Sequence, residues 1–180
     1  MAYCLETLGG ISVGCESSLG GIRSVYIANY GDVTEVDYSS ANTINDIVLA
    51  GNAKFHKYTF RKETGNMEST LTVNEQAGTN YVTTNINLVF TKMETKKRIE
   101  IAALAKAQLS VIVEDMNGKL WMVGRPEDEY VSASAGTANT GTAKGDQNSY
   151  NITLTGASAT YPYEVERSLL DTIVADEVTA

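Results

Sequence analysis

The sequence contains little cysteine, proline, histidine or tryptophan: its 180 residues include two cysteines, two prolines, one histidine and one tryptophan. Two cysteines cannot build a disulfide framework, so we expect Cys4 and Cys15 to be reduced in a chain made in a reducing compartment. His56 has no second histidine or cysteine pair at ligand spacing. This argues against a zinc site or a two-histidine iron site, and we predict no metal or cofactor.

Long apolar runs and basic segments are also missing. The longest purely apolar run, 101–105, is far shorter than the roughly 20 residues of a membrane-spanning helix. The first residues show neither the basic nor the apolar region of a secretory signal. There are 14 basic and 22 acidic residues, giving a net charge of −8. Because nucleic-acid binding depends on clustered cations, we expect no tight binding of nucleic acid, and no membrane partner.

What is present predicts a globular chain. Apolar residues make up 43% of the sequence, and its length is enough to bury one core without metal or disulfide support. We divide the chain into a flexible glycine-rich arm (1–21), one β domain (22–175) and a short tail (176–180).

Alternating apolar and polar residues predict a mainly β fold, an antiparallel sandwich or partial barrel with one flanking helix. Gly31-Asp32 predicts a hairpin between strands 22–30 and 33–38, and Asn117-Gly118 predicts a tight one between 109–114 and 119–124. Further strands are expected at 55–61, 67–75, 81–91 and 150–156, and a short strand and helix at 165–174. We expect a loop or one-turn helix at 39–49, and a mobile loop or frayed strand at 135–144.

The strands around 67–91 predict a long hairpin with two different faces. Its apolar face is expected to bury Leu71, Val73, Ile86, Leu88 and Phe90. Its other face is neutral and polar, where a solvated sheet commonly carries Lys and Glu. The members of this polar face are Thr70, Thr72, Asn74, Asn85 and Asn87, and the turn is expected at Ala77, Gly78, Thr79 and Asn80.

Residues from about 92 to 107 contain the strongest helical signal. Ile99, Ala103 and Ala107, flanked by Leu104, form its expected buried stripe. A basic cluster precedes this stripe, consisting of Lys92, Lys96, Lys97 and Arg98. In an acidic protein this cluster indicates either a salt-bridge partner, in this chain or in a neighbouring subunit, or an ordinary solvated helix face.

Recognisable catalytic patterns are missing. There is no Gly-x-Ser-x-Gly elbow, 141–146 lacks the spacing of a phosphate loop, and the pairs Glu164/Glu166 and Glu127/Glu129 resemble solvated surface charge. Trp121 is interpreted as a core anchor rather than a ligand platform. We therefore predict no enzyme activity and assign no catalytic residue.

Three segments resemble a known family. Residues 107–124 (AQLSVIVEDMNGKLWMVG) resemble a stretch of the tail-tube-like structural proteins of tailed bacteriophages, especially those infecting Bacteroidetes. Segments 140–143 (TGTA) with 146–156 (DQNSYNITLTG), and 14–22 (GCESSLGGI), are similar to their closing loop with strand and to their opening. Neck and ring proteins of short-tailed phages share this type of domain.

The resemblance implies a virion protein, made in the host cytoplasm, that forms hexameric rings stacked into a tail tube or neck conduit for the genome. Its partners are further copies of itself and other tail or neck proteins. Thr70, Thr72, Asn74, Asn85 and Asn87 are expected to line the lumen, because a neutral face does not retain passing DNA. The expected inter-subunit residues are Ala77, Gly78, Thr79, Asn80, Lys96, Lys97 and Arg98.

The alternative is a monomeric or trimeric β-sandwich that acts as a binding or decoration module, either adhesin-like or associated with a capsid. Such a module is expected to carry exposed aromatic side chains in its loops. The candidates for that role are Tyr81, Tyr130 and Tyr161.

Overall fold

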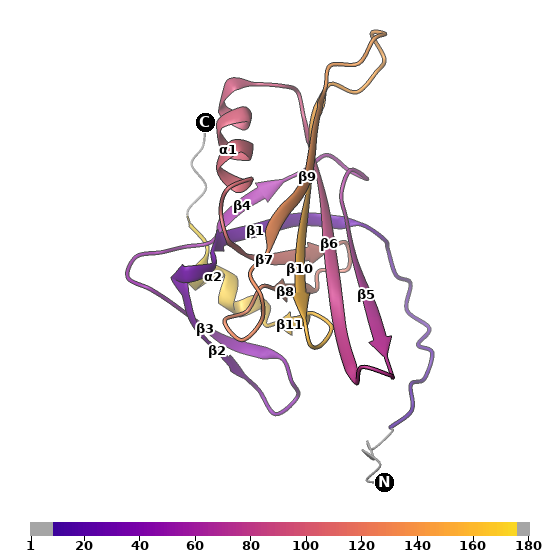
Figure 1. Cartoon of the computed structure of the whole chain (residues 1–180), viewed down its shortest axis with the longest axis vertical. Coiled ribbons are helices and arrows are strands. Elements are labelled where there is room, and N and C mark those ends of the chain that lie inside the picture. Colours follow the sequence, from indigo (N-terminus) through magenta and orange to yellow (C-terminus); the bar gives the residue numbers. More distant parts are fainter. Residues whose placement is uncertain (1–8, 176–180) are drawn as a thin grey trace.

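The computed structural model describes residues 9–175, so Cys4, most of the first half of the predicted arm and the tail at 176–180 lie outside the described residues. Residues 9–21 form an arm without helix or strand that leads into the first strand (Figure 1). The strands are β1 (Ile22–Asn29), β2 (Val33–Tyr38), β3 (Ile44–Leu49), β4 (His56–Thr59), β5 (Asn66–Asn74), β6 (Thr79–Thr91), β7 (Leu109–Asp115), β8 (Leu120–Val123), β9 (Ser132–Asn139), β10 (Ser149–Ser158) and β11 (Tyr163–Val165). The helices are α1 (Thr95–Leu104) and α2 (Leu170–Ile173), with 3-10 turns η1 (Tyr30–Asp32) and η2 (Arg167–Leu169).

Two sheets form the body of the protein, which confirms the predicted mainly β fold with a flanking helix. The larger sheet has the strand order β2-β3-β11-β8-β7-β1-β4, and the smaller has the order β5-β6-β10-β9. Pairing is antiparallel throughout except between β11 and β3. Figure 1 shows β5, β6, β9 and β10 running along the long axis of the molecule.

Two apolar cores hold these layers together. The first lies between the sheets, where Ile86 and Leu88 of β6 and Leu154 of β10 meet Val25 and Val111. The second lies on the other face of the larger sheet and is closed by the short C-terminal helix; it includes Tyr26, Ile44, Phe55, Ile112, Met122 and Ile173. Strand β7 contributes to both cores, which explains its nearly continuous apolar sequence.

The first predicted hairpin is wrong. β1 pairs with β4 and β7, whereas β2 pairs with β3. The 3-10 turn η1 separates β1 from β2, and the Tyr30 amide donates to the carbonyl of Gln108 at 2.9 Å. The chain therefore changes direction at η1 and does not fold back along β1.

The predicted loop or one-turn helix at 39–49 is also wrong, because 44–49 forms β3. The pairing of β2 with β3 shifts register twice, between Val33 and Glu35 and between Asp37 and Tyr38. Buried residues therefore recur every third position, as at Ile44 and Ile47, and this spacing imitates a helical pattern.

The helix is present but shorter than predicted, and it faces the body differently. Leu104 is buried and Ile101 half-buried, whereas Ile99 is 57% exposed and Ala103 is exposed. The predicted stripe is therefore rotated by about one residue. Among the described residues no helix has the length and apolar character to cross a membrane.

The long hairpin is confirmed, but part of its apolar face is not core. Ile86 and Leu88 are fully buried, whereas Leu71 and Val73 are 45% and 55% exposed. From Thr70 to Asn74 every residue of β5 is exposed, so the end of the hairpin is uncovered on both faces. In the glycine-rich tract predicted as a loop or frayed strand, 135–139 belongs to β9.

Candidate functional site

The first candidate surface is the outer face of the smaller sheet, which we call the polar sheet face. Thr70, Thr72, Asn74, Asn85 and Asn87 all point to it. The strand register requires this, because Glu68 pairs with Asn85 and Asn66 with Asn87. The first three are exposed and the two β6 asparagines half-buried, and the face opposite them is the inter-sheet core.

Side-chain hydrogen bonds cross this face from strand to strand. The Asn87 amide donates to Asn66 Oδ1 at 3.0 Å and accepts from the Thr153 hydroxyl at 2.8 Å, linking β5, β6 and β10. A second chain links β6, β10 and β9, because Thr155 Oγ1 lies 2.8 Å from both Asn85 Oδ1 and Ser134 Oγ. These hydrogen bonds join all four strands of the smaller sheet across the part of the face that contains Asn85 and Asn87.

The polar sheet face carries almost no charge. Glu68 is the only charged residue in the sequences of β5, β6, β9 and β10. An anionic polymer moving along it would therefore meet hydrogen-bonding groups but no cation that could release condensed counterions and hold it.

Both edges of the smaller sheet are open. Within the described part of the chain, β5 pairs only with β6, and β9 only with β10. Each strand is antiparallel to its neighbour, so the edge strands β5 and β9 also run in opposite directions. Open edges present unpaired backbone donors and acceptors that suit pairing with another chain.

The predicted inter-subunit residues lie in two separate places. Ala77, Gly78, Thr79 and Asn80 are exposed at the tip of the β5–β6 hairpin, although Thr79 and Asn80 already belong to β6. The positive φ of Gly78, 63°, allows this tight turn. Figure 1 places this tip and α1 toward opposite ends of the molecule.

The basic cluster at the start of α1 divides into paired and unpaired cations. Lys92 and Lys97 both form ion pairs with Glu94, and the Lys97 ammonium also donates to the carbonyl of Thr91 at 2.7 Å. Lys96 and Arg98 are exposed and have no ion pair within the described residues. The prediction of an internal partner is therefore confirmed for two of the four cations.

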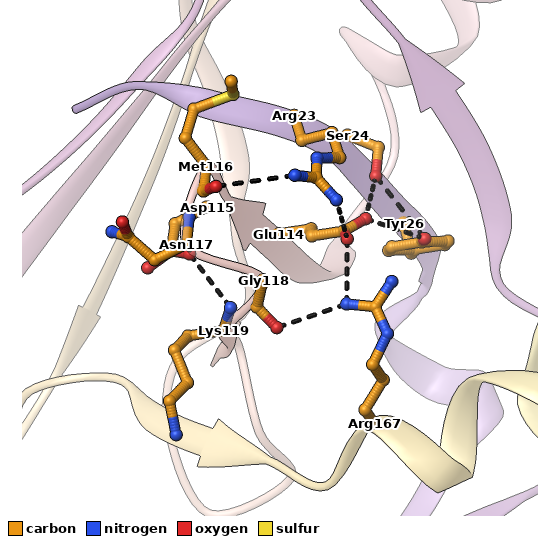
Figure 2. Close-up of polar contacts among 10 residues, drawn as sticks. All are labelled: Arg23, Ser24, Tyr26, Glu114, Asp115, Met116, Asn117, Gly118, Lys119 and Arg167. Atoms are coloured by element: carbon orange, nitrogen blue, oxygen red, sulfur yellow. Dashed lines mark hydrogen bonds and ion pairs between the residues drawn. The ribbon is translucent and has the colours of Figure 1, made fainter. Parts of the chain in front are cut away.

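A buried carboxylate cluster lies on the larger sheet, and sequence reasoning missed it (Figure 2). The Glu114 side chain is 3% exposed and accepts hydrogen bonds from Ser24 at 2.6 Å and Tyr26 at 3.2 Å. Arg167 lies 3.0 Å and Arg23 3.6 Å from its other oxygen. Burial opposes ionisation of Glu114, but the hydrogen bonds from Ser24 and Arg167 outweigh it and lower the pKa of the carboxyl.

The turn beside this cluster holds the N-terminal arm. Asp115 Oδ1 accepts from the amides of Asn117 and Lys119, at 2.8 Å and 2.9 Å, and fixes the predicted Asn-Gly hairpin. The Asn117 side chain then accepts from the Leu19 amide at 2.9 Å and donates to the Leu19 carbonyl at 3.1 Å. The arm is therefore fixed at its root, while residues 9–20 are exposed.

Replacing Asn117 with alanine is expected to release the root of the arm. Both hydrogen bonds to Leu19 are lost, so the Leu19 amide should exchange its hydrogen at least about tenfold faster, while the body loses less than about 1 kcal/mol of stability. Hydrogen exchange followed by mass spectrometry measures both effects. Asn80→Ala, at the exposed hairpin tip, is the control. Unchanged protection at Leu19 would contradict this role of Asn117.

We compared the chain with protein-family models, curated proteins and solved structures. None of them matches it.

The remaining candidate residues do not converge on a common site. Tyr81, Tyr130 and Tyr161 are 46%, 43% and 54% exposed, and they lie on different segments. His56 is exposed on β4. Trp121 is half-buried and belongs to neither core, and its indole N–H donates to Asp115 Oδ2 at 3.3 Å. The predicted role of Trp121 as a core anchor is therefore wrong. Within residues 9–175, no group of His, Cys, Asp and Glu is arranged to hold a metal ion.

Proposed function

We propose that this protein is a virion structural protein whose copies join into rings, hexameric by the resemblance to tail-tube-like proteins, and that the rings stack into a phage tail tube or neck conduit. The observation that carries the proposal is the smaller sheet, which combines two open edges with a polar outer face whose only charged residue is Glu68. In the proposed ring the polar sheet face lines the lumen through which the genome leaves, and the protein has no enzyme activity.

The strand directions are compatible with such a ring. Rotation about an axis roughly parallel to the strands preserves the direction of every strand, so β5 of one copy would meet β9 of the next antiparallel. A closed ring built this way has a continuous antiparallel barrel inside and no free edge.

The composition of β9 supports the same arrangement. Its sequence, SASAGTAN, has only small side chains, which allow another strand to approach closely without steric conflict. It also lacks the charged or proline residues that commonly protect an exposed edge.

Proline substitution in β5 tests edge pairing directly. Successive backbone N–H groups of a strand point to opposite edges, so of Thr70 and Leu71 one donates toward β6 and the other toward the open edge. We expect one of Thr70→Pro and Leu71→Pro to leave the monomer folded but to abolish rings, while the other destabilises the fold.

Negative-stain electron microscopy with light scattering measures the assembly of wild type and variants, and circular dichroism checks their folding. Rings or tubes with a central hole are expected for the wild type. A wild-type protein that stays monomeric at high concentration would overturn the proposal and favour the alternative module with exposed tyrosines. Rings that persist in both proline variants would overturn the edge-pairing step.

A further inference from the structure

The exposed side of α1 is a basic surface with an apolar centre. Lys96 and Arg98 on the helix and Lys106 just after it are exposed, and Ile99 between them is 57% exposed. The carboxylate of Glu100 is directed to the Tyr58 hydroxyl, at 3.4 Å. We call Lys96, Arg98, Ile99 and Lys106 the basic helix face. None of its three cations has an ion pair within the described residues.

The outer side of the β2–β3 pair has the opposite character. Asp37 lies directly across from Asp46, and Glu35 directly across from Val48, so all four point to the same side. Val48 is 41% exposed, and the three acidic residues are exposed. We call Glu35, Asp37, Asp46 and Val48 the acidic strand face. Like charges directly opposite each other destabilise a strand pair, and no cation in the described part of the chain compensates them.

The two faces carry opposite charges and are otherwise alike in composition. Each combines an exposed β-branched aliphatic side chain, Ile99 or Val48, with three charged side chains of one sign. Complementary charges of this kind fix the partner and the register of a contact.

The two faces cannot satisfy each other within one copy. Figure 1 shows α1 toward one end of the long axis and the β2–β3 pair toward the other. A contact between the basic helix face of one copy and the acidic strand face of another is therefore head-to-tail and repeats from copy to copy. Because the two faces lie at different heights along this axis, such a contact would displace successive copies along it, which is also the direction of the strands of the smaller sheet.

We propose that the basic helix face of one copy binds the acidic strand face of a second copy, and that this contact joins successive rings of the assembly. The inference rests on the proposed self-assembly, but it concerns surfaces separate from the β5 and β9 edges. It assigns the helix cations to the contact between rings rather than to the lumen or to a nucleic acid.

Paired charge reversals test the contact. The helix variant is Lys96→Glu with Arg98→Glu, and the strand variant is Asp37→Lys with Asp46→Lys. In each variant alone the two faces carry charges of the same sign, so we expect stacking affinity to fall at least about tenfold. An equimolar mixture presents opposite signs again and should restore stacking. Arg61→Glu with Lys62→Glu, two exposed cations outside both faces, is the matched control and should stack like the wild type.

Light scattering at low and high salt and electron microscopy separate the outcomes. Single rings from each variant, with stacked tubes from the mixture, support the inference. Stacked tubes from either variant alone, or no recovery in the mixture, would overturn it while leaving the proposed ring intact. If no rings form but the wild type makes salt-sensitive linear oligomers that follow the same pattern, the contact stands and the ring proposal fails.

Discussion

Replacing Gly124 with alanine is expected to lower the free energy of unfolding by about 3 kcal/mol, enough to reduce the melting temperature by roughly 6 to 12 °C in a chain of this size. Gly124 has a φ of +77°, a conformation that costs an L-residue stability. A Cβ at this position would lie 2.8 Å from the carbonyl oxygen of Leu109 and 2.9 Å from Cγ2 of Val131. The backbone carbonyl cannot move away, because Leu109 and Val131 are joined by two backbone hydrogen bonds of 2.8 Å.

Thermal unfolding and urea titration of Gly124→Ala measure this loss. Gly145→Ala is the matched control, since a Cβ there meets no atom within 4 Å and the backbone is not left-handed. We expect the control to stay within about 0.5 kcal/mol of the wild type. Equal stability of the two variants would contradict this prediction, because it would show that the backbone at Leu109 and Val131 can move to make room for a Cβ on residue 124.

Replacing Glu114 with alanine is expected to cost about 2 to 3 kcal/mol at neutral pH. The buried hydroxyls of Ser24 and Tyr26 lose the carboxylate that accepts from them, and the link from β7 to Arg167 of the C-terminal segment is lost. Chemical denaturation measures the effect. Glu129→Ala, which removes an exposed carboxylate, is the control and should change stability little. A loss no greater than that of the control would contradict a structural role for the cluster.

The same carboxylate predicts an acid limb in the stability profile. Because folding lowers the pKa of Glu114 below its ordinary value of 4.5, its contribution is complete above that value and is lost as pH falls through the folded-state pKa. In Glu114→Gln this part of the pH dependence should disappear, so the difference from the wild type should shrink as pH falls below about 4.5. Unfolding free energies between pH 7 and pH 3 measure it. A constant difference over this range would exclude Glu114 as the titrating group.

Sequence reasoning worked where a local signal determined the structure. Asn117-Gly118 identified the β7–β8 hairpin, and alternation in 81–91 and 150–156 identified β6 and β10 with their buried faces. In each case the turn chemistry or the two-residue period is contained in a few neighbouring residues.

It failed where the determining contact is distant. The register shift between β2 and β3 opposite Asp37 and Tyr38 gave Ile44 and Ile47 a spacing that resembles a helix. The buried carboxylate cluster brings together Glu114, Arg23 and Arg167, which are more than fifty residues apart in the sequence. No local spacing in the sequence therefore predicts it. Ile99 has the helical spacing of a buried stripe with Ala103 and Ala107, and only the position of α1 against the body shows that its side chain is exposed.

The short strand β11 determines when the chain can finish folding during synthesis. β11 lies between β3 and β8, and β3 reaches the rest of the larger sheet through the pairing of Ile44 with Val165. A ribosome must therefore make almost the whole chain before the β2–β3 pair, produced near the beginning, can take its place in the sheet. In the proposed assembly, an unfinished chain would not yet carry its acidic strand face in its final place in the sheet, so only completed copies would join.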